Sequence, residues 1–258
     1  MTQATPTPTL RRWTETIALV TGANRGIGRS LVDALIERGV PKVYAAARNP
    51  DTVQTLVSAH PERVVALKLD VTRPADIEAA AGQARDVNLL INNAGTLHWG
   101  DVLAENAREA LRADLAVNLH GAHDLTLALA DSLKANRGGI ILLSSIAGLA
   151  NFPALGTYSI SKAAVHSLTQ GLRAALKPAG VQVSGVYPGP VDTDMADQLE
   201  MDKASPASVA AQILDGFAAG AEDIFPDPMA EEVGTGYAGD PKAVETQFAA
   251  MAAEDPAA

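Results

Sequence analysis

The sequence predicts an α/β fold, a single doubly wound domain in which a central parallel sheet of six to seven strands carries helices on both faces. Three observations support this fold class. Short apolar runs alternate with helix-length segments along most of the chain. Several of these runs are continuous rather than alternating, as in strands that are covered on both faces. The first run leads directly into a glycine-rich turn and a helix, which is the opening of a Rossmann-type fold.

The expected strands follow the apolar runs, and the expected helices lie between them. Strands are expected at 17–20, 43–47, 64–67, 89–91, 140–143 and 181–186. Helices are expected near 26–38, 51–58, 74–84, 101–111, 114–135, 157–177 and 204–220. This order implies right-handed crossovers between parallel strands. The pattern weakens after about residue 190, where 222–228 has room for one short strand and 241–252 for a helix.

Composition excludes several classes of protein. The chain contains no cysteine, so disulfides and thiolate metal sites are excluded and a reducing cytoplasm is the expected location. A formal charge of −10 argues against a nucleic-acid partner. No apolar run reaches the ~20 residues that a membrane helix needs, and we expect no membrane contact. His120 and His123 have a metal-binding spacing, but no third ligand follows, so no metal is expected.

A glycine-rich turn joins the first expected strand to the first expected helix. In "TGANRGIG" (21–28) glycines stand at 22, 26 and 28, a residue type used where backbone turns tightly or approaches a ligand closely. The following helix offers free N–H groups and the positive end of its dipole. Such glycines can serve a tight turn alone, but their place after the first strand of a parallel pattern indicates a pyrophosphate site.

Six further motifs follow in order and carry a resemblance to a known family. They are "LDV" at 69–71, "NNAG" at 92–95, "VNLHGA" at 117–122, "ILLSSIAG" at 141–148, "YSISK" at 158–162 and "YPGPVDTDM" at 187–195. Together with TGxxxGxG at 21–28, roughly residues 15–195 resemble the short-chain dehydrogenase/reductase family. The resemblance implies an oxidoreductase that transfers a hydride between a nicotinamide cofactor and a carbonyl or alcohol.

The resemblance also implies a catalytic group of four residues, namely Asn118, Ser145, Tyr158 and Lys162. Tyr158 and Lys162 are one helical turn apart. Lys162 is therefore expected to lower the pKa of Tyr158, the general acid/base, toward the working range. The Ser145 hydroxyl is expected to donate to the carbonyl oxygen as charge develops there. In the family, Asn118 helps a water connect the lysine to solvent.

The cofactor is expected along the carboxyl edge of the sheet, and the predicted form is NADP. The second strand ends in Ala47 and Arg48, where NAD-users carry an acid, and a guanidinium there suits a 2′-phosphate. Arg25 is either a second cation for that phosphate or a solvated loop charge, and NAD remains the alternative cofactor. The contacts that the resemblance implies, besides Arg48, are Thr21, Gly22, Asn24, Arg25, Gly26, Ile27, Gly28, Asp70, Val71, Asn93, Ala94, Gly95, Tyr158, Lys162, Pro188, Gly189, Val191 and Thr193.

The segments expected around the substrate are apolar, which favours a small apolar ketone, aldehyde or alcohol. His98 either lines the mouth of this site or packs against the protein. Residues 193–203 are expected to form a mobile lid. The expected lining is Leu97, Trp99, Ile146, Phe152, Leu155, Met195 and Leu199.

The domain is expected to span residues 14–258, after a Thr/Pro-rich, disordered tail at 1–13. Residues 221–258 depart from the family's usual ending and are interpreted as an atypical C-terminal extension. That ending normally contributes to a tetramer, so a homodimer through the helices at 114–135 and 157–177 is the predicted assembly.

A competing function from another class is a sensor or scaffold protein that binds dinucleotide without turnover. It predicts loss of the catalytic residues while the glycine turn persists. All four catalytic positions are present, so the sequence favours the enzyme.

Overall fold

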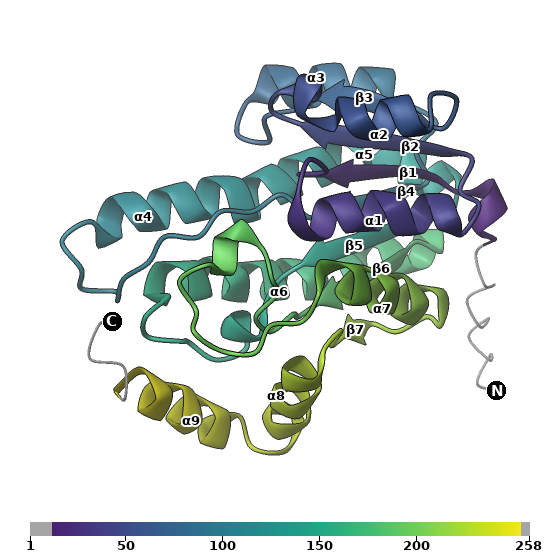
Figure 1. Cartoon of the computed structure of the whole chain (residues 1–258). Coiled ribbons are helices and arrows are strands. Elements are labelled where there is room, and N and C mark those ends of the chain that lie inside the picture. Colours follow the sequence, from purple (N-terminus) through teal and green to yellow (C-terminus); the bar gives the residue numbers. More distant parts are fainter. Residues whose placement is uncertain (1–11, 254–258) are drawn as a thin grey trace, which may run out of the picture.

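The computed structural model describes residues 12–253, and within them a seven-stranded sheet has the order β3-β2-β1-β4-β5-β6-β7 (Figure 1). Every neighbouring pair is parallel. The order reverses between β1 and β4, so a doubly wound sheet is confirmed and its crevice lies beyond the carboxyl ends of these strands. The strands are β1 Ile17–Thr21, β2 Lys42–Ala47, β3 Val64–Lys68, β4 Leu89–Asn92, β5 Gly139–Leu143, β6 Gln182–Val186 and β7 Asp223–Ile224.

Helices cover both faces of the sheet because successive strand residues point to opposite sides. Ala18 and Val20 of β1 pack in the core beneath α1 and α7, whereas Leu19 between them packs in the core beneath α3, α5 and α6. The continuous apolar strands predicted from sequence therefore serve two cores. The helices on the sheet are α1 Gly26–Glu37, α2 Gln54–Ala59, α3 Pro74–Gln83, α4 Ala107–Asp114, α5 Ala122–Ala135, α6 Gly156–Leu176 and α7 Pro206–Ala218.

The helix after β4 differs from the prediction of separate helices at 101–111 and 114–135. Residues 101–106 form turns, in which the Asp101 carboxylate accepts a hydrogen bond from the Leu103 N–H. Helix α4 starts only at Ala107 and runs through a π-helical segment, Leu115–Gly121, directly into α5. A side-chain-to-backbone bond of this kind offers the chain an alternative to helix, which explains the late start.

The C-terminal part contains a helix that was not predicted, α8 Pro228–Gly239, followed by α9 Pro241–Ala253. The three glycines of α8 (234, 236 and 239) hide its helical pattern in the sequence. Asp227 caps α8 by accepting from the Ala230 N–H at 2.9 Å. Val233, Val244 and Phe248 of the α8–α9 pair form a separate apolar cluster with Ile146 and Tyr187 from the main domain.

At the other end, Trp13 lies in a short 3₁₀ helix, Trp13–Glu15, and its ring packs against Phe217 with 6.5 Å between centroids. Trp13, the last residue of the predicted tail, thus packs on the domain, and residues 1–11 of that tail lie outside the described residues. No helix in the described part of the chain has both the length and the apolar character needed to span a bilayer.

Candidate active site

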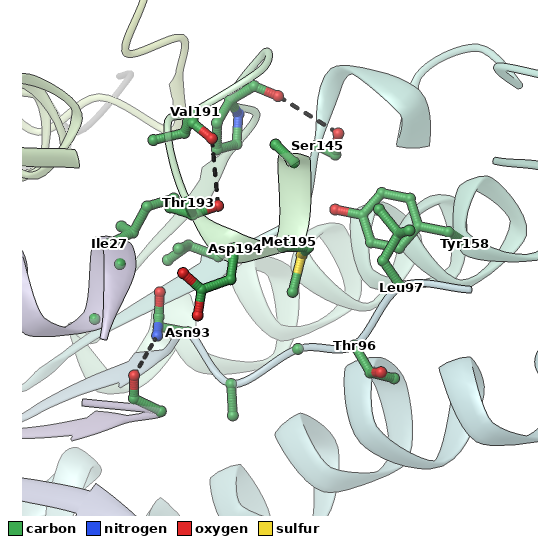
Figure 2. Close-up of a pocket in the computed structure, with 18 of the residues that line it drawn as sticks. Ile27, Asn93, Thr96, Leu97, Ser145, Tyr158, Val191, Thr193, Asp194 and Met195 are labelled. Atoms are coloured by element: carbon green, nitrogen blue, oxygen red, sulfur yellow. Dashed lines mark hydrogen bonds between the residues drawn. The ribbon is translucent and has the colours of Figure 1, made fainter. Parts of the chain in front are cut away.

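A cavity of about 1010 Å³ lies at the carboxyl edge of the sheet. Its walls come from the glycine turn, the ends of β2, β4 and β5, the start of α6 and the segment after β6. Figure 2 shows Asn93 and Ile27 toward one end of the drawn region and Tyr158 with Leu97 at the other. The cavity therefore joins the predicted nucleotide end to the predicted catalytic end.

The glycine turn brings backbone against the cavity where a side chain would not fit. A Cβ on Gly28 would lie 2.2 Å from the carbonyl oxygen of Gly22, and Gly26 has a φ of +53° with Thr193 only 3.0 Å from the place of its Cβ. Helix α1 begins at Gly26, so its unpaired N–H groups face this turn. Backbone N–H groups, a helix dipole and missing side chains make an anion site at this point.

Thr21 is the one predicted cofactor residue that does not line the cavity. Its buried hydroxyl accepts hydrogen bonds from the N–H groups of Asn93 and Ala94 at 3.0 and 2.9 Å. The Asn93 side chain in turn donates to the carbonyls of Thr21 and Gly22. Thr21 therefore ties the end of β1 to the end of β4. The other predicted cofactor residues, from Gly22 through Thr193 and including Arg48, all line the cavity.

Two hydroxyls stand at the catalytic end. Tyr158 is 8% exposed, and in Figure 2 its hydroxyl points into the cavity on the side of Ser145 and Met195. Burial raises the pKa of Tyr158 to about 12, against a lowering effect from its hydrogen bond with the Ser145 side chain and with a smaller rise from the charge of Asp114. The buried phenol is therefore held in its protonated form, which is the form that an acid needs.

Lys162 lies behind the tyrosine, with its Nζ 5.5 Å from the centre of the Tyr158 ring and 2.8 Å from the Leu143 carbonyl oxygen, to which it donates. Burial lowers the pKa of Lys162 to about 8, and the charge of Asp114 opposes this fall. The expected lowering of the Tyr158 pKa is not found, because burial, which disfavours the charged phenolate, has the largest effect on this group and raises its pKa.

Asn118 is buried in the π-helical segment and does not line the cavity. Its side chain accepts from the Thr96 N–H at 2.8 Å and donates to the Thr96 carbonyl and to the Ser161 hydroxyl at 2.9 and 2.8 Å. A π-bulge in a helix often marks a functional site. Here it places one amide between the loop after β4 and the catalytic helix α6.

Three charged side chains at the predicted nucleotide end of the cavity, Arg48, Asp70 and Arg25, are relevant to the choice of cofactor. Arg48 is exposed and lines the cavity beside Ala47. The Thr72 hydroxyl and N–H hold the pKa of Asp70 below its ordinary value against burial, and Arg48 adds to this effect. Arg25 forms an ion pair with Asp194 on the segment after β6, so it is not a free loop charge.

The substrate end is apolar, and every residue predicted to line it does so. The expected segment 194–201 also supplies Met201, whereas three lining residues from the extension were missed by sequence reasoning: Met229, Phe248 and Met251. No motif marks them, and only the unpredicted α8–α9 fold brings them here. His98 does not line the cavity and instead bonds to Asp114.

A parallel doubly wound sheet with a glycine cradle, a buried Tyr–Lys pair and a serine defines a dinucleotide-binding oxidoreductase. A family model described as short chain dehydrogenase matches residues 16–204. The chain belongs to this family, as the sequence motifs predicted, and it is an oxidoreductase acting on C=O or CH–OH groups.

Relatives are similar over most of this chain. A Saccharomyces cerevisiae protein named NADPH-dependent 1-acyldihydroxyacetone phosphate reductase is 33% identical, and the match covers 73% of this chain and 65% of that protein. A 3-alpha-(or 20-beta)-hydroxysteroid dehydrogenase from Mycobacterium bovis is 34% identical, with 72% of this chain and 73% of that protein covered.

Solved structures agree with the fold. A short chain dehydrogenase from Burkholderia cenocepacia in complex with NADP is 36% identical, with a TM-score of 0.87 over 92% of this chain and 99% of that one. A short-chain dehydrogenase from Sphingobium yanoikuyae in complex with NADPH is 25% identical, with a TM-score of 0.77 over 90% of this chain and 95% of that one.

Proposed function

We propose that this enzyme is an NADPH-dependent reductase of apolar ketones or aldehydes, working reversibly on the corresponding alcohols. The observation that carries the proposal is the pairing of Tyr158 and Ser145 at the apolar end of the cavity, with Lys162 buried behind them. The two relatives with NADP or NADPH in their structures support the same cofactor here.

The residues present fit this cofactor. The glycine cradle at Gly26 and Gly28 accepts a pyrophosphate close to backbone. Arg48 lines the nucleotide end, where a guanidinium binds a phosphate by two parallel hydrogen bonds. Asp70 and Val71 line the same end, while Val191 and Thr193 line the wall opposite and are proposed to contact the nicotinamide amide.

When bound, NADPH supplies the hydride, and the chain supplies the proton and the geometry. The Ser145 hydroxyl donates to the substrate oxygen and stabilises the charge that develops there. The Tyr158 hydroxyl gives its proton to the same oxygen, and its high pKa keeps that proton available across neutral pH. Lys162 holds its ammonium beside the phenol and stabilises the phenolate that forms.

The test follows NADPH absorbance with a panel of apolar ketones and aldehydes. We expect turnover with the wild type and a loss of about 10²–10⁴-fold in kcat with Tyr158→Phe, while NADPH affinity stays unchanged. Tyr237→Phe on α8, a tyrosine outside the cavity lining, is the matched control. If Tyr158→Phe turned over like the wild type, the assignment would be wrong. NADPH binding without any turnover would favour the sensor hypothesis.

We also propose a homodimer. Leu127 on α5 is 58% exposed and Ile160 on α6 is 38% exposed, and large apolar side chains on two helices are suited to a subunit contact. Light scattering should give twice the chain mass, and Leu127→Glu should shift it toward the monomer. A wild-type monomer at micromolar concentration would contradict this proposal.

A further inference from the structure

A buried carboxylate stands next to the catalytic group and has no part in the mechanism above. Asp114, the last residue of α4, is fully buried. It accepts a hydrogen bond from the Thr157 hydroxyl at 2.8 Å through one oxygen, and its other oxygen lies 2.8 Å from Nδ1 of His98. A charge removed from water needs partners of this kind, and here both partners belong to segments that build the site.

The side chains of Asp114 and Asn118 form two equivalent cross-links between α6 and the loop after β4, about one helical turn apart, and each cross-link is called a rung below. Each reaches α6 on one side and the loop between β4 and α4 on the other. On α6 the two contact points are also one turn apart, and they come directly before the tyrosine and the lysine. The α6 partners of the two rungs are Thr157 and Ser161, and the loop partners are His98 and Thr96.

The two rungs differ in charge. Asn118 brings an amide that donates and accepts, whereas Asp114 brings a carboxylate that uses both oxygens as acceptors. Within the described residues, the titratable groups that interact with Asp114 are His98 in the loop and Tyr158 and Lys162 on α6. His98 has 39% of its side chain exposed, so this imidazole links the buried carboxylate to the surface, while the charge of Asp114 acts on the buried ammonium of Lys162.

We propose that Asp114 is a positioning residue for the reduction reaction, holding the first turn of α6 against the β4–α4 loop and keeping a negative charge beside the Tyr158–Lys162 pair. This proposal rests on the proposed function, since it concerns the same site. The first role fixes the direction of the Tyr158 hydroxyl, because Thr157 precedes it in the chain. The second role sustains the ammonium of Lys162, which burial alone would discharge more easily.

Two variants separate the roles. Asp114→Asn removes the charge and keeps the size of the side chain, whereas Thr157→Val removes one hydrogen bond and keeps the charge. We expect kcat to fall about 10²-fold in Asp114→Asn, because the neutral amide no longer sustains the Lys162 ammonium and accepts with one oxygen where the carboxylate used two, and a small displacement of a reacting group alone can cost this much. We expect about a fivefold fall in Thr157→Val, the worth of one hydrogen bond. NADPH affinity should change little in either variant, because neither residue lines the cavity.

The readout that a merely structural role would not move is the titration of Lys162. In protein labelled with ¹³C-lysine, its NMR signal is identified by its absence in Lys162→Met. We expect a midpoint near pH 8 in the wild type, a lower midpoint in Asp114→Asn and an unchanged one in Thr157→Val. The basic limb of the kcat/KM profile should move in the same direction, toward lower pH.

An unchanged Lys162 midpoint in Asp114→Asn would overturn the charge role, and an unchanged kcat in Thr157→Val would overturn the positioning role. If Asp114→Asn did not fold, His98→Leu, at a half-exposed position, supplies the second variant, and it should lower kcat by removing the loop side of the rung. The NMR titration needs no turnover, so failure of the proposed function and failure of this proposal remain distinguishable.

Discussion

The two halves of the cavity wall differ in how far short sequence motifs supply their lining residues. The nucleotide and catalytic end comes from residues 22–193, where most lining residues belong to a short motif. The outer part of the substrate end comes from α8 and α9, whose lining residues are Met229, Phe248 and Met251 and belong to no motif. The chemistry depends on few polar atoms at fixed places, whereas the substrate wall needs only apolar surface of the right shape.

The difference reflects the energetics of the two kinds of contact. A buried polar group that loses its partner is costly, so positions such as Asn118 and Asp114 tolerate little change. An apolar wall accepts substitutions of similar volume at small cost. Methionine is the most adaptable apolar residue, and four methionines from segment 193–203 and the extension line this wall: Met195, Met201, Met229 and Met251. We therefore expect large effects of substitution at the catalytic end and graded effects at the outer end.

The largest effect is expected for Lys162→Met, which should abolish measurable reduction while stabilising the fold. Burial lowers the Lys162 pKa from 10.5 to about 8, so below pH 8 the folded protein carries the whole cost of a buried ammonium, on the order of 3 kcal/mol. The Leu143 carbonyl loses its donor in the variant, which offsets about 1 kcal/mol. Urea unfolding at pH 7 should thus show a gain of about 2 kcal/mol.

The sign of the pH dependence provides the check. Between pH 8 and 10 the unfolded wild type binds more protons at Lys162 than the folded protein, so wild-type stability rises with pH. Lys162→Met should lack this rise. Lys134→Met on the surface of α5 is the matched control and should change stability by less than about 0.5 kcal/mol. Equal pH dependence in the wild type and Lys162→Met would contradict the buried ammonium.

At the nucleotide end, Arg48→Ala should weaken NADPH binding about 10–100-fold, since a charge-assisted hydrogen bond pair to phosphate is lost. NADH has no 2′-phosphate, so its dissociation constant should not change. Fluorescence titration with both cofactors measures this ratio, and Arg29→Ala, a cation of α1 outside the cavity lining, serves as control. An equal loss of affinity for NADPH and NADH would show that Arg48 does not bind the 2′-phosphate.

At the outer end, Met251→Ala should raise KM for bulky apolar ketones about 3–10-fold, the effect of one or two lost methylene contacts. The smallest ketones and NADPH should bind as before, because this residue lies on the extension, far along the chain from the motifs. Met251→Leu keeps the volume and should behave as the wild type. A change in kcat for every substrate alike would mean that the extension supports the catalytic end instead.

The smallest effect is expected for Asp194→Asn, which breaks the pair with Arg25. Both partners are about two-thirds exposed, at 66% and 63%, so stability should change by no more than about 0.5 kcal/mol. NADPH should bind about 2–3-fold tighter, because Arg25 becomes available to the phosphate. This gain in binding free energy is smaller than the contribution of one full hydrogen bond. Unchanged NADPH affinity would show that Arg25 serves only the ion pair with Asp194 and does not bind the phosphate. Calorimetry gives both quantities from one sample.

The sequence by itself determined the sheet and the cradle. Continuous apolar runs that alternate with helix-length segments are typical of parallel strands covered on both faces, and a glycine is required at 28 because a Cβ there would meet the carbonyl of Gly22, six residues earlier. The Tyr158–Lys162 spacing likewise follows from helix geometry alone. These features depend on contacts that are local or imposed by a regular period, and both can be read from a one-dimensional pattern.

Only the tertiary structure decided which distant groups meet. The Asp114 carboxylate reaches Thr157, 43 residues further along the chain, and Met251 joins a cavity that begins at Gly22. The direction of the Tyr158 pKa shift also depends on burial by the whole fold, which raises the pKa where the YxxxK spacing predicted a lowering. Desolvation and long-range packing are sums over the whole fold, so no local pattern of residues encodes them.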